Sequence, residues 1–273
     1  SMRWMTGSTP TTLAMVLSLA FGAGAANAAP TTTVAKAAAA KPFLWQNATI
    51  YFLLTDRFNN AFTGNDLSYG RNADAAPLRG FMGGDLAGIT NKINDGYFDS
   101  LGVNAIWLTP PVEQIHEGTD EGTGKSYGFH GYWASDFTAV DANLGTETDF
   151  RNFVDAAHAR GIRVILDVVM NHIGPETTID KAWPQQWVRT EPECTHKDAK
   201  TTIECTLVKN LPDIRTDSDE EVELPPQLVA KWRREGRYTQ EVKELDEFFK
   251  RTGYPRAPRY YLMKWHADWV RKY

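Results

Sequence analysis

The stretch of the chain best suited to chemistry is a short apolar run that contains and ends in polar side chains. Residues 164–170 are almost all apolar, and Asp167, Asn171 and His172 lie within this run or directly after it. Such a run predicts a strand that is buried on both faces, as in a parallel sheet. A carboxylate, an amide and an imidazole are costly to bury alone, but they build active sites at the carboxyl-terminal edge of a β/α sheet. Two interpretations remain at this point: an active-site edge, or a buried strand whose polar end is satisfied by backbone groups.

A second group of candidate residues lies upstream, in the segment Gly128–Trp133. It contains His130, Tyr132 and Trp133 within four residues. Flat amphipathic rings are suited to stacking on sugars, although taken singly such residues more often fill a core or a surface. A third group, Leu211-Pro212-Asp213-Ile214, places one carboxylate in an otherwise apolar stretch.

The elements that would position these residues alternate between strands and helices. Apolar runs at 48–55, 103–108 and 164–168 predict three strands, and two helical patterns, 86–101 and 150–160, lie between them. Asp85 is a predicted N-cap, and Thr146 with Asp149 resembles a capping box. Residues 109–145 are predicted to form a long loop. This order predicts right-handed βαβ units and a parallel sheet with helices outside.

The pattern changes after His172. Residues 174–258 are polar, proline-rich and weakly periodic, and a stretch of this length predicts a small inserted domain rather than a bare loop. Helical spacing resumes over 260–273. The segment contains Cys194 and Cys205, for which we expect a local disulfide, with zinc binding at Cys194 and His196 as the weaker alternative.

Composition and the amino terminus indicate an exported globular protein. Hydrophobic residues make up 42% of the 273 residues, and the net charge of -5 does not favour nucleic-acid binding. Residues 1–28 fit a secretory signal peptide, with a positive start, an apolar run too short to span a bilayer, and small residues before the predicted cleavage site. Residues 29–41 fit a flexible leader. We therefore expect a periplasmic or secreted protein without a stable membrane anchor.

Taken together, the motifs resemble the α-amylase family of glycoside hydrolases (family 13), and within it the bacterial periplasmic α-amylases. Three ordered motifs carry the resemblance: Gly128–Trp133, Asp167–His172 and Leu211–Ile214. The segments 50–58 and 83–89 also look like that family. The resemblance implies an α/β fold, the first three βα units of a TIM (β/α)8 barrel, with the barrel incomplete in this chain. Residues 42–173 would form the barrel portion, 174–258 the inserted domain B, and 259–273 the barrel helix after the insertion.

The resemblance also implies roles for individual residues. Asn171 and Asp213 match positions that bind a structural calcium ion between barrel and insertion, which suits a cation that prefers oxygen ligands; a simple hydrogen-bonded pair is the alternative. The other matched positions would bind an α-glucan or maltooligosaccharide. Tyr132 would stack on the sugar with His130 and Trp133 on either side, His172 would hydrogen-bond its hydroxyls, and Asp167 would orient an arginine of the site.

One departure from the family limits what the resemblance implies. The nucleophile, the acid/base and a third carboxylate of the family lie on barrel strands four, five and seven, whereas three strands are predicted here. No catalytic carboxylate is therefore assigned, and the chain alone is expected to be inactive. The complete protein is expected to cleave α-1,4-glucosidic bonds with retention. A glucanotransferase of the same family and a non-catalytic glucan-binding protein remain open, as does the oligomeric state.

Overall fold

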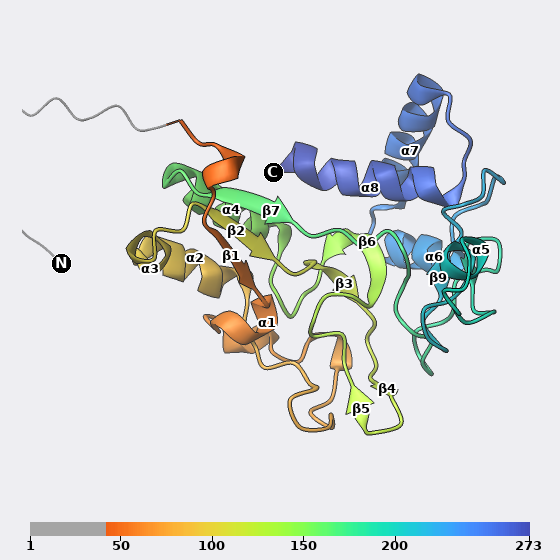
Figure 1. Cartoon of the computed structure of the whole chain (residues 1–273), viewed down its shortest axis with the longest axis horizontal. Coiled ribbons are helices and arrows are strands. Elements are labelled where there is room, and N and C mark those ends of the chain that lie inside the picture. The colour runs from red at the N-terminus through yellow and green to blue at the C-terminus, as the bar shows by residue number, and fades with distance from the viewer. Residues whose placement is uncertain (1–41) are drawn as a thin grey trace, which may run out of the picture. The chain divides into compact units, whose positions relative to one another are not determined.

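Three parallel strands form the sheet around which the described part of the chain is built. The structure is a computed structural model, and it describes residues 42–273. Strand β2 (Ala105–Leu108) lies between β1 (Ile50–Leu53) and β7 (Arg163–Leu166), and all pairings are parallel, as expected (Figure 1). The predicted signal peptide and leader lie outside the described residues.

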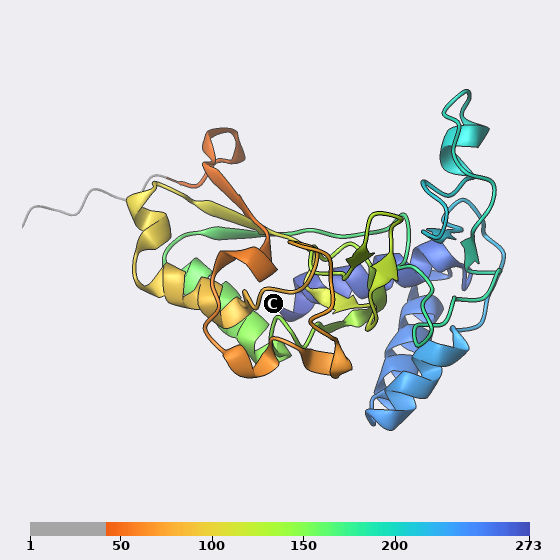
Figure 2. The same cartoon turned by 90° about the horizontal axis from the view of Figure 1, so that it is seen from below.

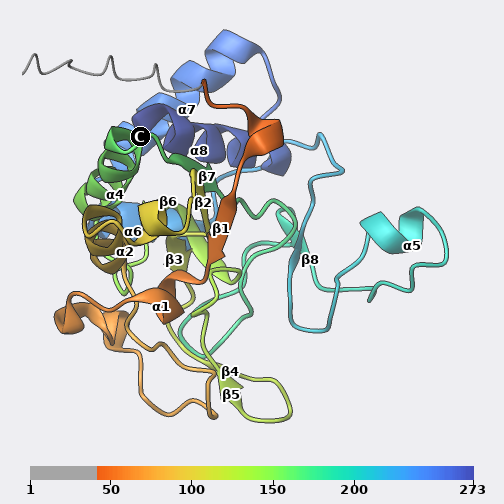
Figure 3. The ribbon, with the colours of Figure 1, turned by 60° about the vertical axis from the view of Figure 1, so that its left-hand side comes forward.

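Two helices cover one face of this sheet. Helices α2 (Leu86–Asn94) and α4 (Glu147–Ala159) lie side by side against the same face of the strands (Figures 2 and 3). Both begin as the sequence predicts. The Asp85 carboxylate accepts a hydrogen bond from the backbone N–H of Gly88 at 2.6 Å, and Thr146 with Asp149 forms a complete capping box. Their apolar faces join the core under the sheet.

The predicted single helix over 86–101 is wrong in its second half. Helix α2 ends at Asn94, and a separate turn, α3 (Tyr97–Ser100), follows. Between them Gly96 adopts a left-handed conformation with φ of 82°, which glycine tolerates without steric cost. The Asp95 carboxylate accepts the Tyr97 N–H at 3.0 Å, so this side chain competes with helical hydrogen bonding at the break.

The predicted loop over 109–145 is also wrong, because it contains four strands. Strand β3 (Val112–Gln114) pairs antiparallel with β6 (Ala134–Val140), and β4 (Thr119–Asp120) pairs with β5 (Lys125–Ser126). Register shifts interrupt the β3–β6 ladder, so its residues do not alternate regularly between polar and apolar. The segment Gly128–Trp133 lies directly before β6.

Strand β7 is shorter and less buried than predicted. Its four residues are exposed or half-buried, and Asp167 to Met170 lie beyond its end. Side chains on the sheet face away from α2 and α4 are also partly exposed: Phe52 retains 51% and Trp107 39% of its accessible surface. The expected burial on both faces therefore does not hold in this chain.

The segment after His172 contains more helix than its weak periodicity suggested. It holds a small antiparallel pair, β8 (Val188–Arg189) and β9 (Asp213–Ile214), and three helices, α5 (Lys200–Ile203), α6 (Pro226–Arg234) and α7 (Tyr238–Thr252). The predicted final helix is confirmed as α8 (Pro258–Lys272), which packs against β6 and donates a hydrogen bond from Trp269 Nε1 to the Phe137 carbonyl at 2.8 Å. The assignment of 174–258 as a separate inserted domain stays a prediction.

Two other features complete the fold. The expected disulfide between Cys194 and Cys205 is present, with Cα atoms 5.0 Å apart. A short helix, α1 (Thr55–Phe58), follows β1, and three 3-10 turns cover Trp45–Asn47, Thr63–Asn65 and Ser68–Gly70. Among the described helices, none has the length and apolar character needed to span a bilayer.

Candidate functional site

The carboxylate of Asp167 is the centre of the candidate site. It lies just beyond the carboxyl end of β7, and its Oδ2 accepts hydrogen bonds from the Tyr132 hydroxyl at 2.8 Å and from Trp107 Nε1 at 3.1 Å. Trp107 comes from the neighbouring strand β2, where it pairs in register with Ile165. Because alternate residues of a strand share a face, Trp107 and Asp167 lie on the same side of the sheet. The structure therefore brings together two groups that the sequence predicted, Tyr132 and Asp167, and adds Trp107, which it did not.

Two imidazoles fix the turn that carries Tyr132. His172 Nε2 lies 3.0 Å from the Tyr132 carbonyl oxygen, and since a carbonyl can only accept, Nε2 carries the proton. The other nitrogen, Nδ1, is then the acceptor for the Asn171 amide at 3.3 Å. On the other side, the Tyr132 N–H donates to His130 Nδ1 at 3.0 Å, so the proton of neutral His130 sits on Nε2. Both predicted histidines thus contact the backbone of Tyr132.

The electrostatics of the site agree with neutral imidazoles. Burial lowers the pKa of His130 to about 4 and also lowers the pKa of His172. Burial, followed by the hydrogen bond to Asp167, raises the pKa of Tyr132 to about 12. At neutral pH the imidazole and phenol rings of the site are therefore uncharged. Such a surface suits a neutral polyhydroxylated ligand better than a charged one, because each ring offers an apolar face and a polar edge.

Aromatic rings continue outward from this cluster. The rings of His130 and Tyr132 are nearly parallel, with centroids 5.9 Å apart, and Trp133 meets His130 edge-on at 4.8 Å. Trp133 also lines a surface groove together with the β4–β5 hairpin and the segment 208–211. Of the predicted sugar-binding residues, Trp133 thus borders this groove.

The two predicted calcium ligands lie on adjacent backbone segments. Asp213 pairs with His172 in an antiparallel bridge, and the Ile214 N–H donates to the Asn171 carbonyl at 2.8 Å. Burial raises the pKa of Asp213 to about 7, and its nearest cationic partner, Arg189, lies 3.6 Å away, longer than a normal hydrogen bond.

These residues fit a hard cation only in part. Calcium takes six to eight oxygen ligands, and Asn171 and Asp213 offer an amide and a carboxylate. Within residues 42–273, no group of three or more His, Cys, Asp or Glu side chains is arranged to hold a metal. Additional ligands would have to be backbone carbonyls, water or groups outside the described residues.

Other buried carboxylates of the described residues have structural partners. Asp56 accepts hydrogen bonds from the backbone N–H groups of Met82 and Gly83. Asp85 caps α2, and the fully buried Asp136 pairs with Lys231 at 2.7 Å and Arg237 at 3.0 Å. Each of these carboxylates anchors a loop or helix.

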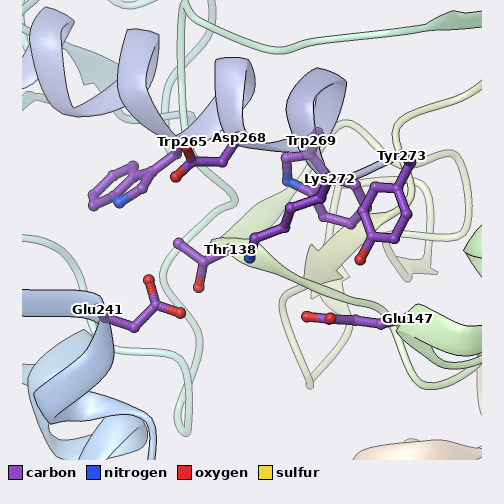
Figure 4. A pocket seen from close by; sticks show the side chains of 8 residues that line it. All are labelled: Thr138, Glu147, Glu241, Trp265, Asp268, Trp269, Lys272 and Tyr273. Carbon is purple, nitrogen blue, oxygen red and sulfur yellow. The ribbon is translucent and has the colours of Figure 1, made fainter. Parts of the chain in front are cut away.

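A separate small cavity lies away from this cluster. It sits between α8, α7, β6 and the first residue of α4, and its volume of about 10 Å³ is close to that needed for a water molecule (Figure 4). The buried indole nitrogen of Trp265 has no hydrogen-bond partner among the described residues and belongs to this lining. The cavity is too small for a sugar and contains none of the predicted site residues.

Comparison with known proteins agrees with this geometry. Residues 52–251 match the family model described as the catalytic domain of alpha amylase. The chain is 36% identical to the periplasmic alpha-amylase of Escherichia coli, over 85% of this chain and 40% of that protein. It is 38% identical to a cyclomaltodextrin glucanotransferase of Thermoanaerobacterium thermosulfurigenes, over 63% of this chain and 24% of that protein. The chain therefore spans less than half the length of these relatives.

Solved structures of similar enzymes also match the chain. A cyclomaltodextrin glucanotransferase matches with a TM-score of 0.55 and 29% identity, over 62% of this chain and 39% of that one. The alpha-amylase of Geobacillus thermoleovorans, solved with acarbose, matches with a TM-score of 0.50 and 34% identity, over 65% of this chain and 35% of that one. A family match that covers most of the described residues, on a parallel sheet with the expected motifs at its carboxyl edge, shows that this chain belongs to the alpha-amylase catalytic-domain family, whose fold is the TIM barrel.

Proposed function

We propose that this chain is the amino-terminal portion of an exported α-amylase-type enzyme and contributes the part of the active site that holds the glucan. The observation that carries the proposal is the cluster at the carboxyl edge of the sheet. Tyr132, Asp167 and His172 come from two segments far apart in sequence and meet through hydrogen bonds of 2.8 and 3.0 Å. At this edge of a β/α barrel, substrate meets the ends of the strands.

In this proposal each residue has a binding role. Tyr132 stacks on the sugar ring with His130 and Trp133 on either side, and His172 hydrogen-bonds its hydroxyls. Asp167 fixes Tyr132 and orients an arginine supplied by a later strand. The three strands β1, β2 and β7 are the first three of the barrel, and residues 174–258 form the inserted domain. Asn171 and Asp213 would hold a calcium ion, to which they would supply an amide and a carboxylate oxygen at the contact of barrel and insertion.

The reaction is hydrolysis of α-1,4-glucosidic bonds of starch or maltodextrins with retention. That reaction needs a nucleophilic carboxylate and a carboxylic acid on opposite sides of the bond. The described residues provide positioning without these two groups, so the covalent and acid–base contributions to catalysis are missing. We therefore expect the 273-residue chain to bind maltooligosaccharides weakly and to leave them intact.

A reducing-sugar assay on starch tests this directly. Purified chain, free of contaminating amylase, should release no sugar above the buffer control. A protein that extends through the remaining barrel strands should be active, and addition of those strands in trans is a second route to activity. Turnover by the 273-residue chain alone would refute the proposal and would mean that one of its own carboxylates is catalytic.

A glucanotransferase is the second candidate, because several relatives of 38–41% identity carry that name. Products distinguish the two in a protein that carries the whole catalytic domain. Linear maltooligosaccharides indicate hydrolysis, whereas cyclic or transfer products indicate the transferase.

A further inference from the structure

Gln114 is a buried amide directly beneath the turn that carries Tyr132. It ends strand β3 and retains 1% of its accessible surface. Its Nε2 donates to the Val112 carbonyl at 2.8 Å, and its Oε1 accepts the Trp133 N–H at 2.6 Å. If the amide were flipped, its NH2 group would face the Trp133 N–H and its oxygen would face the Val112 carbonyl. These two partners therefore determine its orientation. Among neutral side chains of this length, an amide is the one that both donates and accepts here.

The backbone of Gln114 is itself held on both sides. Its N–H donates to Asp141 Oδ2 at 2.9 Å, and its carbonyl accepts from Arg71 Nη2 at 3.1 Å. Arg71 and Asp141 pair with each other at 2.8 Å, and neither side chain has any exposed surface. Gln114 is therefore a fixed support, because its main chain cannot move without breaking hydrogen bonds to both members of a buried ion pair.

The turn above Gln114 is fixed at the same peptide. The Trp133 N–H belongs to the peptide whose carbonyl is that of Tyr132, and this carbonyl accepts from His172 at 3.0 Å. The Trp133 carbonyl in turn accepts a hydrogen bond from the Ile115 N–H at 2.9 Å. The packing is also close here. If Gly128 carried a side chain, its Cβ would lie 3.0 Å from the Cβ of Gln114. The peptide between Tyr132 and Trp133 is thus held from the Gln114 side and from the His172 side.

We propose that Gln114 is a positioning residue of the glucan site: its side chain fixes the Tyr132–Trp133 peptide and so sets the orientation of the two aromatic rings. The inference rests on the proposed function for its ligand, but the anchoring of the peptide can be measured without any ligand. Gln114 would touch no sugar. It acts through the backbone of Trp133.

The first test compares Gln114→Met with Gln227→Met. Methionine keeps the length of glutamine and removes both hydrogen bonds. Gln227 is a matched control because its amide also donates to backbone carbonyls, but to those of Lys181 and Ala182 rather than to the turn. Amide hydrogen exchange, measured by NMR, should become about tenfold faster at Trp133 in Gln114→Met and stay unchanged in Gln227→Met. Affinity for maltoheptaose, measured by calorimetry, should fall by about tenfold in Gln114→Met alone.

The second test uses Gln114→Glu, which keeps the proposal testable if Gln114→Met fails to fold. A protonated carboxyl donates to Val112 and accepts from Trp133 as the amide does. The carboxylate has no proton to donate, so it faces the Val112 carbonyl acceptor to acceptor and loses the bond that fixes its orientation toward Trp133. The nearby charged groups are the Arg71–Asp141 pair and Glu113, which pairs with Lys231 at 2.9 Å and His116 at 2.8 Å. Slow exchange at Trp133 and wild-type affinity should therefore return as the pH is lowered from 8 to 5. The same titration is carried out on the wild type. Its pH dependence, which includes the contributions of the histidines, is subtracted from that of Gln114→Glu.

The outcomes separate the two claims. Unchanged exchange at Trp133 in Gln114→Met, or no recovery in Gln114→Glu at low pH, overturns the anchoring role. Faster exchange with unchanged maltoheptaose affinity overturns the positioning role in binding. If the wild-type chain shows no maltoheptaose binding, the proposed function of this chain fails, and the exchange measurements still decide whether Gln114 holds the peptide.

Discussion

Replacement of Arg71 by methionine should destabilise the protein more than any exposed charge substitution. The Arg71 guanidinium contacts Asp141 through two bonds of 2.8 Å, Asn143 at 2.8 Å, and the carbonyls of Gln114 and Ile115 at 3.1 and 3.0 Å. Arg71→Met therefore leaves a buried carboxylate and several acceptors without their donor. Breaking a buried pair in this way costs about 3–5 kcal/mol of unfolding free energy.

That loss is large against the total stability of a domain, which is roughly 5–15 kcal/mol. At roughly 2–4 °C per kcal/mol for a domain of this size, the melting temperature should fall by ~6–20 °C. Urea unfolding followed by circular dichroism measures the change, with Lys243→Met as the control. Lys243 pairs with Glu247 at 4.0 Å on an exposed helix face, where both side chains are 67% exposed, and its loss should cost less than ~1 kcal/mol. Equal, small losses in both variants would refute the view that the Arg71–Asp141 pair anchors the turn.

Three further predictions concern the disulfide, calcium and pH. Reduction of Cys194–Cys205 should lower the unfolding free energy by about 3 kcal/mol on loop-closure grounds, and two free thiols by intact mass in oxidised, metal-free protein would contradict the bond. In a protein that carries the whole catalytic domain, chelation should lower the melting temperature because an ion bound only by the folded state stabilises it. Asp213→Ala should remove most of this response; an unchanged response would place the site elsewhere. Burial lowers the pKa of His130 to about 4 from 6.5, so the unfolded chain binds the proton more readily between these values. The stability from neutral His130 is thus complete above pH ~6.5 and lost toward pH 4. His130→Gln should therefore lose less unfolding free energy than the wild type between pH 7 and 4, and parallel curves would rule this out.

The parallel sheet and its helices were predictable because their signals are local. Asp85 and the Thr146–Asp149 pair are capping residues whose action depends on backbone groups three residues away. The break at Gly96 was missed because the apolar spacing of Tyr97 and Leu101 continues across it, although the left-handed glycine ends the helix. Strands β3 and β6 were missed because their pairing is long-range and irregular, with bulges that hide the alternation.

The residues of the candidate site also divide into those with a local sequence signal and those that depend on long-range contacts. Tyr132, Asp167 and His172 were named because their motifs are contiguous in sequence. Trp107 and Gln114 were not, because each acts on a residue distant in the chain: Trp107 on Asp167 across the sheet, and Gln114 on Trp133 across the β3–β6 pair. The position of Trp107 near the end of a predicted strand beside Asp167 was a usable signal. For Gln114 the sequence offered none, since burial of an amide becomes visible only with the tertiary structure.

The most direct test of the glucan site is a titration of the chain with maltoheptaose, followed by NMR signals of the tyrosine and tryptophan side chains. The proposed site predicts saturable changes at Tyr132, Trp133 and Trp107, with no change at Trp265 in the remote cavity, and their loss in Tyr132→Ala. Changes confined to other tryptophans, or saturable binding that persists in Tyr132→Ala, would contradict a glucan site at this edge of the sheet.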